Sequence, residues 1–292
     1  MPSRRTVSML EAGLVTFLWS SSFIFIKLGL EDIPPMTFAA YRYTMASAVL
    51  MAYVFARHRS YVMSLDRDKV LKYVFLGFCG YFIAQGMQFF GLYYLQAITV
   101  TFILNMTPLI VLFLGVVILG EKPGRRQLLG VGIALLGVMA FFSGEDLQID
   151  QKMGVVLTFI SGVGWAVYMV ATRHIVRKDG ENVVVMTAIS MFSGAMMLLI
   201  GSLASDDICT ISNSGILIIV WLALANTAAA FFLWNRALIH LHAYEQSILQ
   251  NTMLIQITIL AMITLGESVD LANLAGISLV FLGVLIVVLK KK

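Results

Sequence analysis

The sequence predicts an all-α integral membrane protein in which ten transmembrane helices form two inverted five-helix repeats. Of the 292 residues, 60% are hydrophobic and 12% are charged, whereas about 25% of the residues of a soluble domain are charged. Most of the chain must therefore lie in lipid. Helices provide hydrogen-bond partners for the backbone N–H and C=O groups over such apolar runs. The strands of a membrane barrel would instead alternate polar and apolar residues. An internal repeat and the distribution of Lys and Arg predict how these helices are arranged.

The two halves of the chain align without a gap when the sequence is shifted by 146 residues. Trp19 then falls on Trp165, Asn105 falls on Asn251, and residues 119–121 (Leu-Gly-Glu) fall on an identical run. Matches at Trp, Asn, Glu and Gly are informative, because leucine matches are common in so apolar a chain. A repeat of this size indicates a protein built from two related halves. We expect a first repeat over 1–144, an outer linker over 145–152, and a second, inverted repeat over 153–292.

Ten apolar runs are long enough to be spans, since about 20 residues cross a bilayer as a helix. The fifth and tenth runs are short, and neighbours are expected to bury part of them. The expected spans are 9–30, 36–56, 70–95, 98–120, 127–142, 153–172, 183–204, 216–238, 244–266 and 271–289.

The basic residues predict the orientation of these spans. With a cytoplasmic N-terminus, the inner segments hold seventeen basic residues and the outer segments hold only Lys152. Loops rich in Lys and Arg stay inside. We therefore expect a multi-pass protein of the cytoplasmic (inner) membrane with both termini in the cytoplasm. The net charge of +4 then reflects loops beside a lipid bilayer, and nucleic acid is not an expected partner. Five spans in each half make the second repeat enter the membrane from the opposite side.

Several segments of the sequence resemble the drug/metabolite transporter superfamily, in particular its EamA-type members. The resemblance covers nearly the whole chain, with two departures. Ser20 stands where a glycine often follows the tryptophan, and Leu254 stands where the repeat predicts a partner for Pro108. If Pro108 distorts its helix, the distortion is therefore expected to be absent from the ninth span. The resemblance implies a central cavity lined by spans 1, 3, 4, 6, 8 and 9. The similar segments are 17–27, Arg42, 91–97, Pro108 with 119–121, and 130–138.

Strongly polar side chains at bilayer depth are costly and usually face a cavity or a neighbouring helix. Tyr81, Gln85 and Gln88 are expected on one face of the third span, because they recur at helical spacing. Amides of this kind can also simply bond another helix, which contributes about 0.6–2 kcal/mol. The candidate substrate-binding residues all lie on the six cavity-lining spans. They are Trp19, Tyr81, Gln85, Gln88, Thr101, Asn105, Trp165, Tyr168, Trp234, Ser247 and Asn251.

Two basic residues inside the spans are expected to have a gating or structural role. Lys27 can snorkel to the outer surface or pair with Glu31. Arg42 lies deeper and must find a partner, so a structural or gating role is favoured over substrate contact. Glu121 and Glu267 are interpreted as interfacial helix caps. The glycines at 130, 137, 276 and 283 allow close helix packing, within the chain by default and between two copies as the alternative. The protein is therefore expected to be a monomer or a homodimer.

The sequence also argues against several function classes. It has no nucleotide-binding loop and no zinc or nucleophile motif, so no cofactor, no metal and no enzyme activity are expected. The span midpoints lack Asp and Glu, which favours downhill transport or exchange over coupling through a carboxylate. We expect a secondary transporter that exports small metabolites such as amino acids by alternating access. The alternatives are an exporter or exchanger of anionic metabolites, and a membrane enzyme acting on a lipid-linked substrate.

Overall fold

The computed structural model describes residues 4–119, 123–143, 147–179, 182–205, 211–238 and 249–288, and these residues form helices joined by short connections, with no strand among them. Six of the helical segments are long and apolar enough to cross a membrane: 6–29, 67–94, 97–117, 149–176, 183–204 and 271–288. The chain is thus an all-helical, multi-pass membrane protein. The other four expected spans lie on helix α2, on helix α7 and on two shorter apolar segments, 213–229 and 249–264.

The first half contains the following helices, with the π-helical turn labelled η1: α1 (Arg4–Gly29), α2 (Pro35–Met63), α3 (Arg67–Gly77), η1 (Phe78–Ile83), α4 (Ala84–Tyr94), α5 (Ala97–Leu104), α6 (Thr107–Leu119) and α7 (Arg125–Phe141). The second half contains α8 (Ile149–Asp179), α9 (Val183–Ala204), α10 (Asn213–Ala223), η2 (Leu224–Ala229), α11 (Ala230–Leu238), α13 (Met253–Thr264) and α14 (Leu271–Val288).

Local sequence signals set many of these boundaries. Pro35 occupies the first turn of α2, where a missing N–H costs nothing. Asp66, Asn182 and Ser212 cap α3, α9 and α10 by accepting hydrogen bonds from main-chain N–H groups of the first turn. Gly266 follows α13 with a φ of 66°, a left-handed conformation that glycine adopts without strain.

Irregular turns recur at the repeat spacing. η1 and η2 each contain six residues, and 146 positions separate them. The helix of the fourth span is also interrupted, between α5 and α6 at Asn105 and Met106, and a turn at Thr252 precedes α13. Asn105 and Thr252 have similar backbone angles, φ −66° and ψ −11° against φ −64° and ψ −17°. The expectation that the ninth span lacks the interruption is therefore wrong, since it forms there without a proline.

Glycines bring α7 and α14 into backbone contact. A Cβ placed on Gly130 would lie 2.7 Å from the carbonyl oxygen of Gly283, and one on Gly137 would lie 2.9 Å from that of Gly276. Only glycine permits so close an approach. The glycine stripe therefore packs inside one chain, which was the default expectation.

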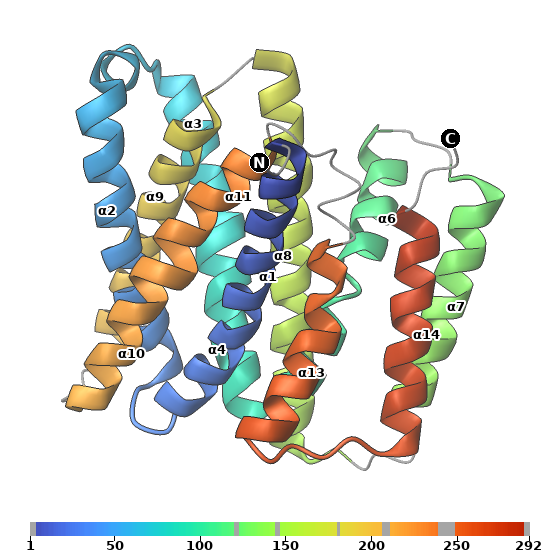
Figure 1. The fold of residues 1–292 in the computed structure, drawn as a ribbon. Helices are drawn as coiled ribbons and strands as arrows, with labels where there is room; N and C mark the ends of the chain where they lie inside the picture. The colour runs from blue at the N-terminus through green and yellow to red at the C-terminus, as the bar shows by residue number, and fades with distance from the viewer. Residues whose placement is uncertain are drawn as a thin grey trace.

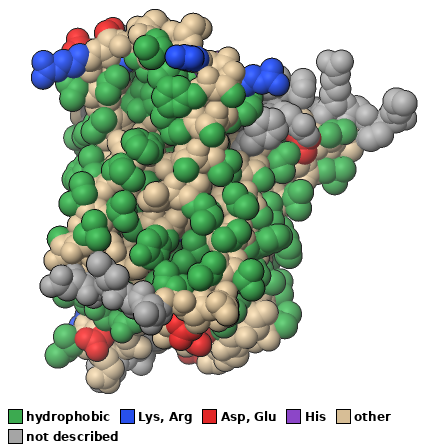
Figure 2. Space-filling model, turned by 90° about the vertical axis from the view of Figure 1, so that its left-hand side faces the viewer, with side chains coloured by type: hydrophobic (Ala, Val, Ile, Leu, Met, Phe, Trp, Pro, Cys, Tyr) green, Lys and Arg blue, Asp and Glu red, His purple; other side chains and the backbone are tan. Residues whose placement is uncertain are grey.

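The helices form one bundle (Figure 1). α2, α9, α3 and α10 lie on one side, α7 and α14 lie on the other, and α1, α4 and α8 run between them. The start of α1 and the end of α14 lie at the same end of the bundle. Figure 2 shows that hydrophobic side chains cover the middle of one face, whereas most Lys and Arg side chains of that face gather at one end. Large apolar side chains such as Leu10, Phe113, Met139 and Ile263 are exposed, as contact with lipid requires.

Candidate functional site

A row of aromatic side chains crosses the interior of the bundle from α2 to α8. The ring centroid of Tyr43 lies 5.8 Å from that of Tyr81, and that of Tyr81 lies 5.7 Å from that of Tyr168. Trp165 stacks on Tyr168, with the centroids 5.0 Å apart. A Cβ on Gly80 would lie 2.4 Å from the Tyr168 ring, so the glycine in η1 makes room for this contact. We call Tyr43, Tyr81, Tyr168 and Trp165 the aromatic row.

The side-chain amide of Gln85 is hydrogen-bonded to the aromatic row. The Tyr43 hydroxyl donates a hydrogen bond to Gln85 Oε1 at 2.6 Å, and the hydroxyl oxygens of Tyr81 and Tyr168 lie 3.5 Å apart. Tyr81 is fully buried. Buried hydroxyl and amide groups are costly unless they bond one another or a ligand. The row is therefore a strip of polar and aromatic groups inside the bundle.

A second aromatic group lies around Trp19. The Trp19 ring lies 4.9 Å from Trp234 and 5.6 Å from Phe231, centroid to centroid. Beside it, the Ser20 hydroxyl donates to Gln256 Oε1 at 2.9 Å, and Gln256 Nε2 donates to Thr252 Oγ1 at 3.1 Å. These contacts join α1 to α11 and to α13.

Arg42 lies in α2 next to Tyr43 and is 5% exposed. Its Nε donates a hydrogen bond to Thr227 Oγ1 in η2 at 3.1 Å. Its guanidinium carbon lies 5.3 Å from the centre of the Tyr43 ring and 6.0 Å from that of Phe89, within the range of a cation–π interaction. Among the described residues, no carboxylate lies within ion-pair distance of Arg42.

Two asparagines in this region keep polar atoms without a partner. Asn226 Nδ2 donates to the Leu18 carbonyl oxygen and to Ser21 Oγ, which ties η2 to α1. Asn226 Oδ1 and Asn251 Nδ2 are buried, and neither has a hydrogen-bond partner within the described part of the chain. Such groups are rare in folded proteins and call for an explanation.

Charged groups join the helices at the end of the bundle that the distribution of Lys and Arg predicts to face outward, which we call the outer end. Lys27 Nζ donates to the carbonyl oxygens of Leu92 and Leu95 at 2.7 and 2.6 Å, rather than pairing with Glu31. Glu267 accepts from the main-chain N–H groups of Ala97 and Ile98. Glu267 is thus a helix cap, as expected, but it caps a helix of the other half. Glu121 lies outside the described residues.

The EamA-like transporter family matches residues 8–143 and again residues 152–289. The chain belongs to the EamA-like transporter family. It is a membrane transporter of this type, and its curated relatives are named as transporters. An uncharacterized transporter of Archaeoglobus fulgidus is 26% identical over 285 residues, covering 96% of both chains. The uncharacterized transporter YyaM of Bacillus subtilis is 25% identical over 272 residues, covering 91% of this chain and 88% of YyaM.

Two further comparisons concern a named substrate and the fold. A protein of Chlamydia trachomatis named as an S-adenosylmethionine/S-adenosylhomocysteine transporter is 24% identical over 203 residues, which cover 66% of this chain and 61% of that protein. A solved structure titled "Crystal structure of protein" superposes with a TM-score of 0.68 at 18% identity, covering 97% of both chains. This likeness concerns the fold alone.

The structure brings only some of the sequence-predicted site residues of this EamA-like transporter together. Tyr81, Gln85, Trp165 and Tyr168 belong to or contact the aromatic row, and Trp19 contacts Trp234. Thr101 instead donates to the Ala97 carbonyl of its own helix. Gln88 and Asn105 are half-buried and make no hydrogen bond through their side chains in the described part. Ser247 lies outside the described residues.

Sequence reasoning missed three residues of this region: Tyr43, Phe89 and Thr227. Tyr43 follows Arg42 directly, and an aromatic residue beside a buried cation is a usable signal. Thr227 lies in η2, and nothing in the sequence distinguishes it from the many hydroxyl residues that bond their own helix.

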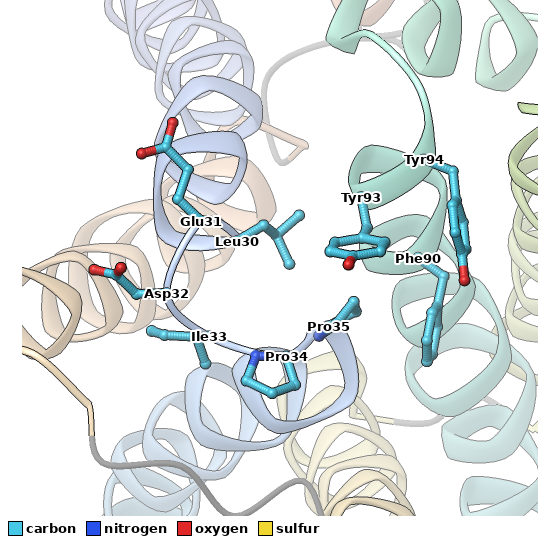
Figure 3. Close-up of a pocket in the computed structure, with 9 residues that line it drawn as sticks. All are labelled: Leu30, Glu31, Asp32, Ile33, Pro34, Pro35, Phe90, Tyr93 and Tyr94. Atoms are coloured by element: carbon cyan, nitrogen blue, oxygen red, sulfur yellow. The ribbon is translucent and has the colours of Figure 1, made fainter. Parts of the chain in front are cut away.

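An outer depression of about 410 Å³ lies away from the aromatic row. Figure 3 shows that the carboxylates of Glu31 and Asp32 turn away from the Tyr93 ring, and Asp32 accepts a hydrogen bond from Ser212 instead. This depression is therefore not the central cavity that the family resemblance implies. Its lining residues are Leu30, Glu31, Asp32, Ile33, Pro34, Pro35, Phe90, Tyr93 and Tyr94.

Proposed function

We propose that this EamA-like transporter is a secondary carrier that exports small metabolites such as amino acids across the cytoplasmic (inner) membrane. The supporting observation is the aromatic row with Gln85, which places hydroxyl, amide and aromatic groups inside an apolar bundle. Lipid-facing helices have no need of such groups, and a small amphipathic solute does. Transport would proceed by alternating access around this region.

The proposal includes ten spans in two inverted repeats, 1–144 and 153–292, joined by an outer linker at 145–152. The contacts between α7 and α14 support the inversion. In the repeat alignment, Gly130 corresponds to Gly276 and Gly137 corresponds to Gly283. The contact between Gly130 and Gly283 in α7 and α14 is therefore equivalent to the contact between Gly276 and Gly137. Both contacts occur. Reciprocal contacts of this kind arise when a two-fold axis relates two units.

An amino acid suits both the site and one relative. Aromatic faces bind the apolar or aromatic part of such a solute, and Gln85 offers an amide to its polar part. S-Adenosylmethionine and S-adenosylhomocysteine, which name the Chlamydia trachomatis relative, are themselves α-amino acids. The alternative class, anionic metabolites, gains support from the unpaired charge of Arg42. The membrane-enzyme alternative gains none, since the curated relatives are named as transporters.

The positions of the acidic residues in the spans bear on how transport is driven. In the described part of the spans, no Asp or Glu lies at mid-depth, and Glu11 lies near the inner end of α1. We therefore propose downhill transport or exchange rather than coupling to protons through a buried carboxylate.

Counterflow in liposomes tests this function. Purified protein is reconstituted with unlabelled L-phenylalanine or L-methionine inside, and uptake of the labelled amino acid is followed. A carrier gives saturable uptake that internal substrate stimulates. Flux that rises linearly with concentration would indicate a pore, and the absence of any stimulated flux for the whole amino acid set would contradict the proposed substrate class.

A further inference from the structure

The charge of Arg42 is buried without a counter-ion. Arg42 is 5% exposed, and no carboxylate of the described residues pairs with it. Within a membrane protein, buried cations almost always pair with an acid or with carbonyl groups. A charge that is retained at this cost without a counter-ion in the described part of the protein is suited to an anionic group that arrives from outside.

The guanidinium also has unused hydrogen-bond donors. An arginine side chain presents five N–H groups in one plane, and the structure uses only the Nε group, which donates to Thr227. The two terminal nitrogens carry the other four, and none of them has an acceptor among the described residues. Those N–H groups form the planar fork that binds a carboxylate through two parallel hydrogen bonds.

Neighbouring groups fix this fork. Tyr43 and Phe89 both lie within cation–π range of the guanidinium carbon, and Thr227 holds its Nε edge. Thr227 is itself anchored, because its hydroxyl donates to the Leu222 carbonyl at 2.8 Å. A guanidinium held in place before binding loses little conformational entropy when a ligand arrives.

Lys27 differs from Arg42 in this respect. Its ammonium already donates to the carbonyl oxygens of Leu92 and Leu95. The half-buried Lys27 is thus already hydrogen-bonded, whereas the terminal nitrogens of the buried Arg42 are available to an anionic group.

From these observations we infer that Arg42 binds the carboxylate of the transported solute. The Tyr43 ring adjoins both Arg42 and Tyr81, and its hydroxyl bonds Gln85. A solute whose carboxylate binds Arg42 therefore extends its remaining atoms along the aromatic row. The ligand class is a small organic acid with an apolar or aromatic part, and amino acids belong to it. This assignment rests on the proposed function and replaces the sequence-based preference for a structural or gating role of Arg42.

Matched ligand pairs test the assignment. Binding of L-phenylalanine, L-methionine and 3-phenylpropionate is compared with binding of their carboxamides, by thermal shift and by counterflow competition. Wild-type protein should bind each carboxylate at least tenfold more tightly than its carboxamide. Arg42→Gln should remove this preference, and Arg42→Lys, which keeps the charge but not the fork, should retain part of it. Lys27→Gln, the control for a general loss of positive charge, should keep the preference.

The melting temperature without ligand separates binding from folding. Arg42→Gln removes an unpaired buried charge, so the ligand-free protein should melt at the same temperature as wild type or higher. A lower melting temperature together with equal losses for carboxylates and carboxamides would assign Arg42 a structural role and overturn the inference. Binding of only the carboxamides, or of none of the probes, would also overturn it. Carboxylates that bind through Arg42 but show no counterflow would leave the inference standing and contradict the proposed carrier function.

Discussion

The Glu267 carboxylate accepts a hydrogen bond from the main-chain N–H of Ala97 at 2.7 Å, although the two residues are 170 positions apart in the sequence. Its other oxygen accepts from Ile98 at 3.0 Å. An anion at a helix N-terminus satisfies free N–H groups and interacts favourably with the helix dipole. The contact therefore fastens the end of α13 to the start of α5 on the outer side of the bundle.

Removing this carboxylate should loosen the outer end. Glu267→Ala loses two charge-assisted hydrogen bonds, each contributing about 1.5–3 kcal/mol, so we expect a melting temperature lower by several degrees. A cysteine placed at buried Ile98 should then react faster with a membrane-impermeant maleimide. Glu31→Gln, at an exposed acid of the same end, is the matched control. If both variants behave alike, Glu267 does not hold the outer end closed.

The glycine contact between α7 and α14 predicts a second effect on stability. Gly137→Ala places a methyl group within 2.9 Å of the Gly276 carbonyl oxygen, and overpacking of this kind costs about 1–3 kcal/mol. Gly132→Ala, on the same helix with open space around its Cβ, should be neutral or stabilising by up to about 1 kcal/mol. Thermal melting of both variants in one detergent measures the difference, and equal melting temperatures would contradict close packing of the two helices.

The aromatic row and the group around Trp19 predict which substitutions weaken substrate binding. Gln85→Ala should reduce affinity about 2- to 10-fold, because a hydrogen bond contributes about 0.5–1.5 kcal/mol. Trp19→Ala should reduce it by about tenfold through lost aromatic contact. Tyr93→Phe, in the outer depression, is the control. Affinity is measured by the thermal shift that the best solute produces, and unchanged shifts in both Gln85→Ala and Trp19→Ala would reject the site.

Labelling tests the topology. Ser64 and Asp270 are exposed and lie between α2 and α3 and between α13 and α14. Ser64→Cys should be labelled from the cytoplasmic side of oriented vesicles, and Asp270→Cys from the outer side. Labelling of both cysteines from one side would exclude the proposed ten-span arrangement.

Much of the fold could be predicted because lipid restricts what a chain can do. The spans follow from apolar length, and the spacing of 146 residues also relates η1 to η2 and Asn105 to Asn251. The end of α2 is less predictable. The helix passes the expected end at residue 56, kinks at His58 (φ −130°, ψ 25°) and continues to Met63, because hydropathy marks where lipid ends and reports neither a kink nor a helical stretch that continues in water.

The site was harder to predict, since it depends on geometry that residue types do not report. Tyr81, Gln85 and Gln88 were expected on one face of a helix with 3.6 residues per turn, but Tyr81 lies in the wider π-helical turn η1. The structure connects Tyr81 and Gln85 through Tyr43. The partners of Lys27 are main-chain carbonyls, and every residue has a carbonyl, so no sequence pattern could have indicated Leu92 or Leu95.

The backbone contact between α7 and α14 has a practical consequence for studying the transport cycle. Two helices that touch main chain to main chain cannot separate without losing their closest contacts, so this pair is suited to remain a fixed unit while other helices rearrange. Spin labels attached to its lipid-exposed positions, Met139 on α7 and Leu282 on α14, would then supply a stationary reference from which the displacement of every other helix can be measured.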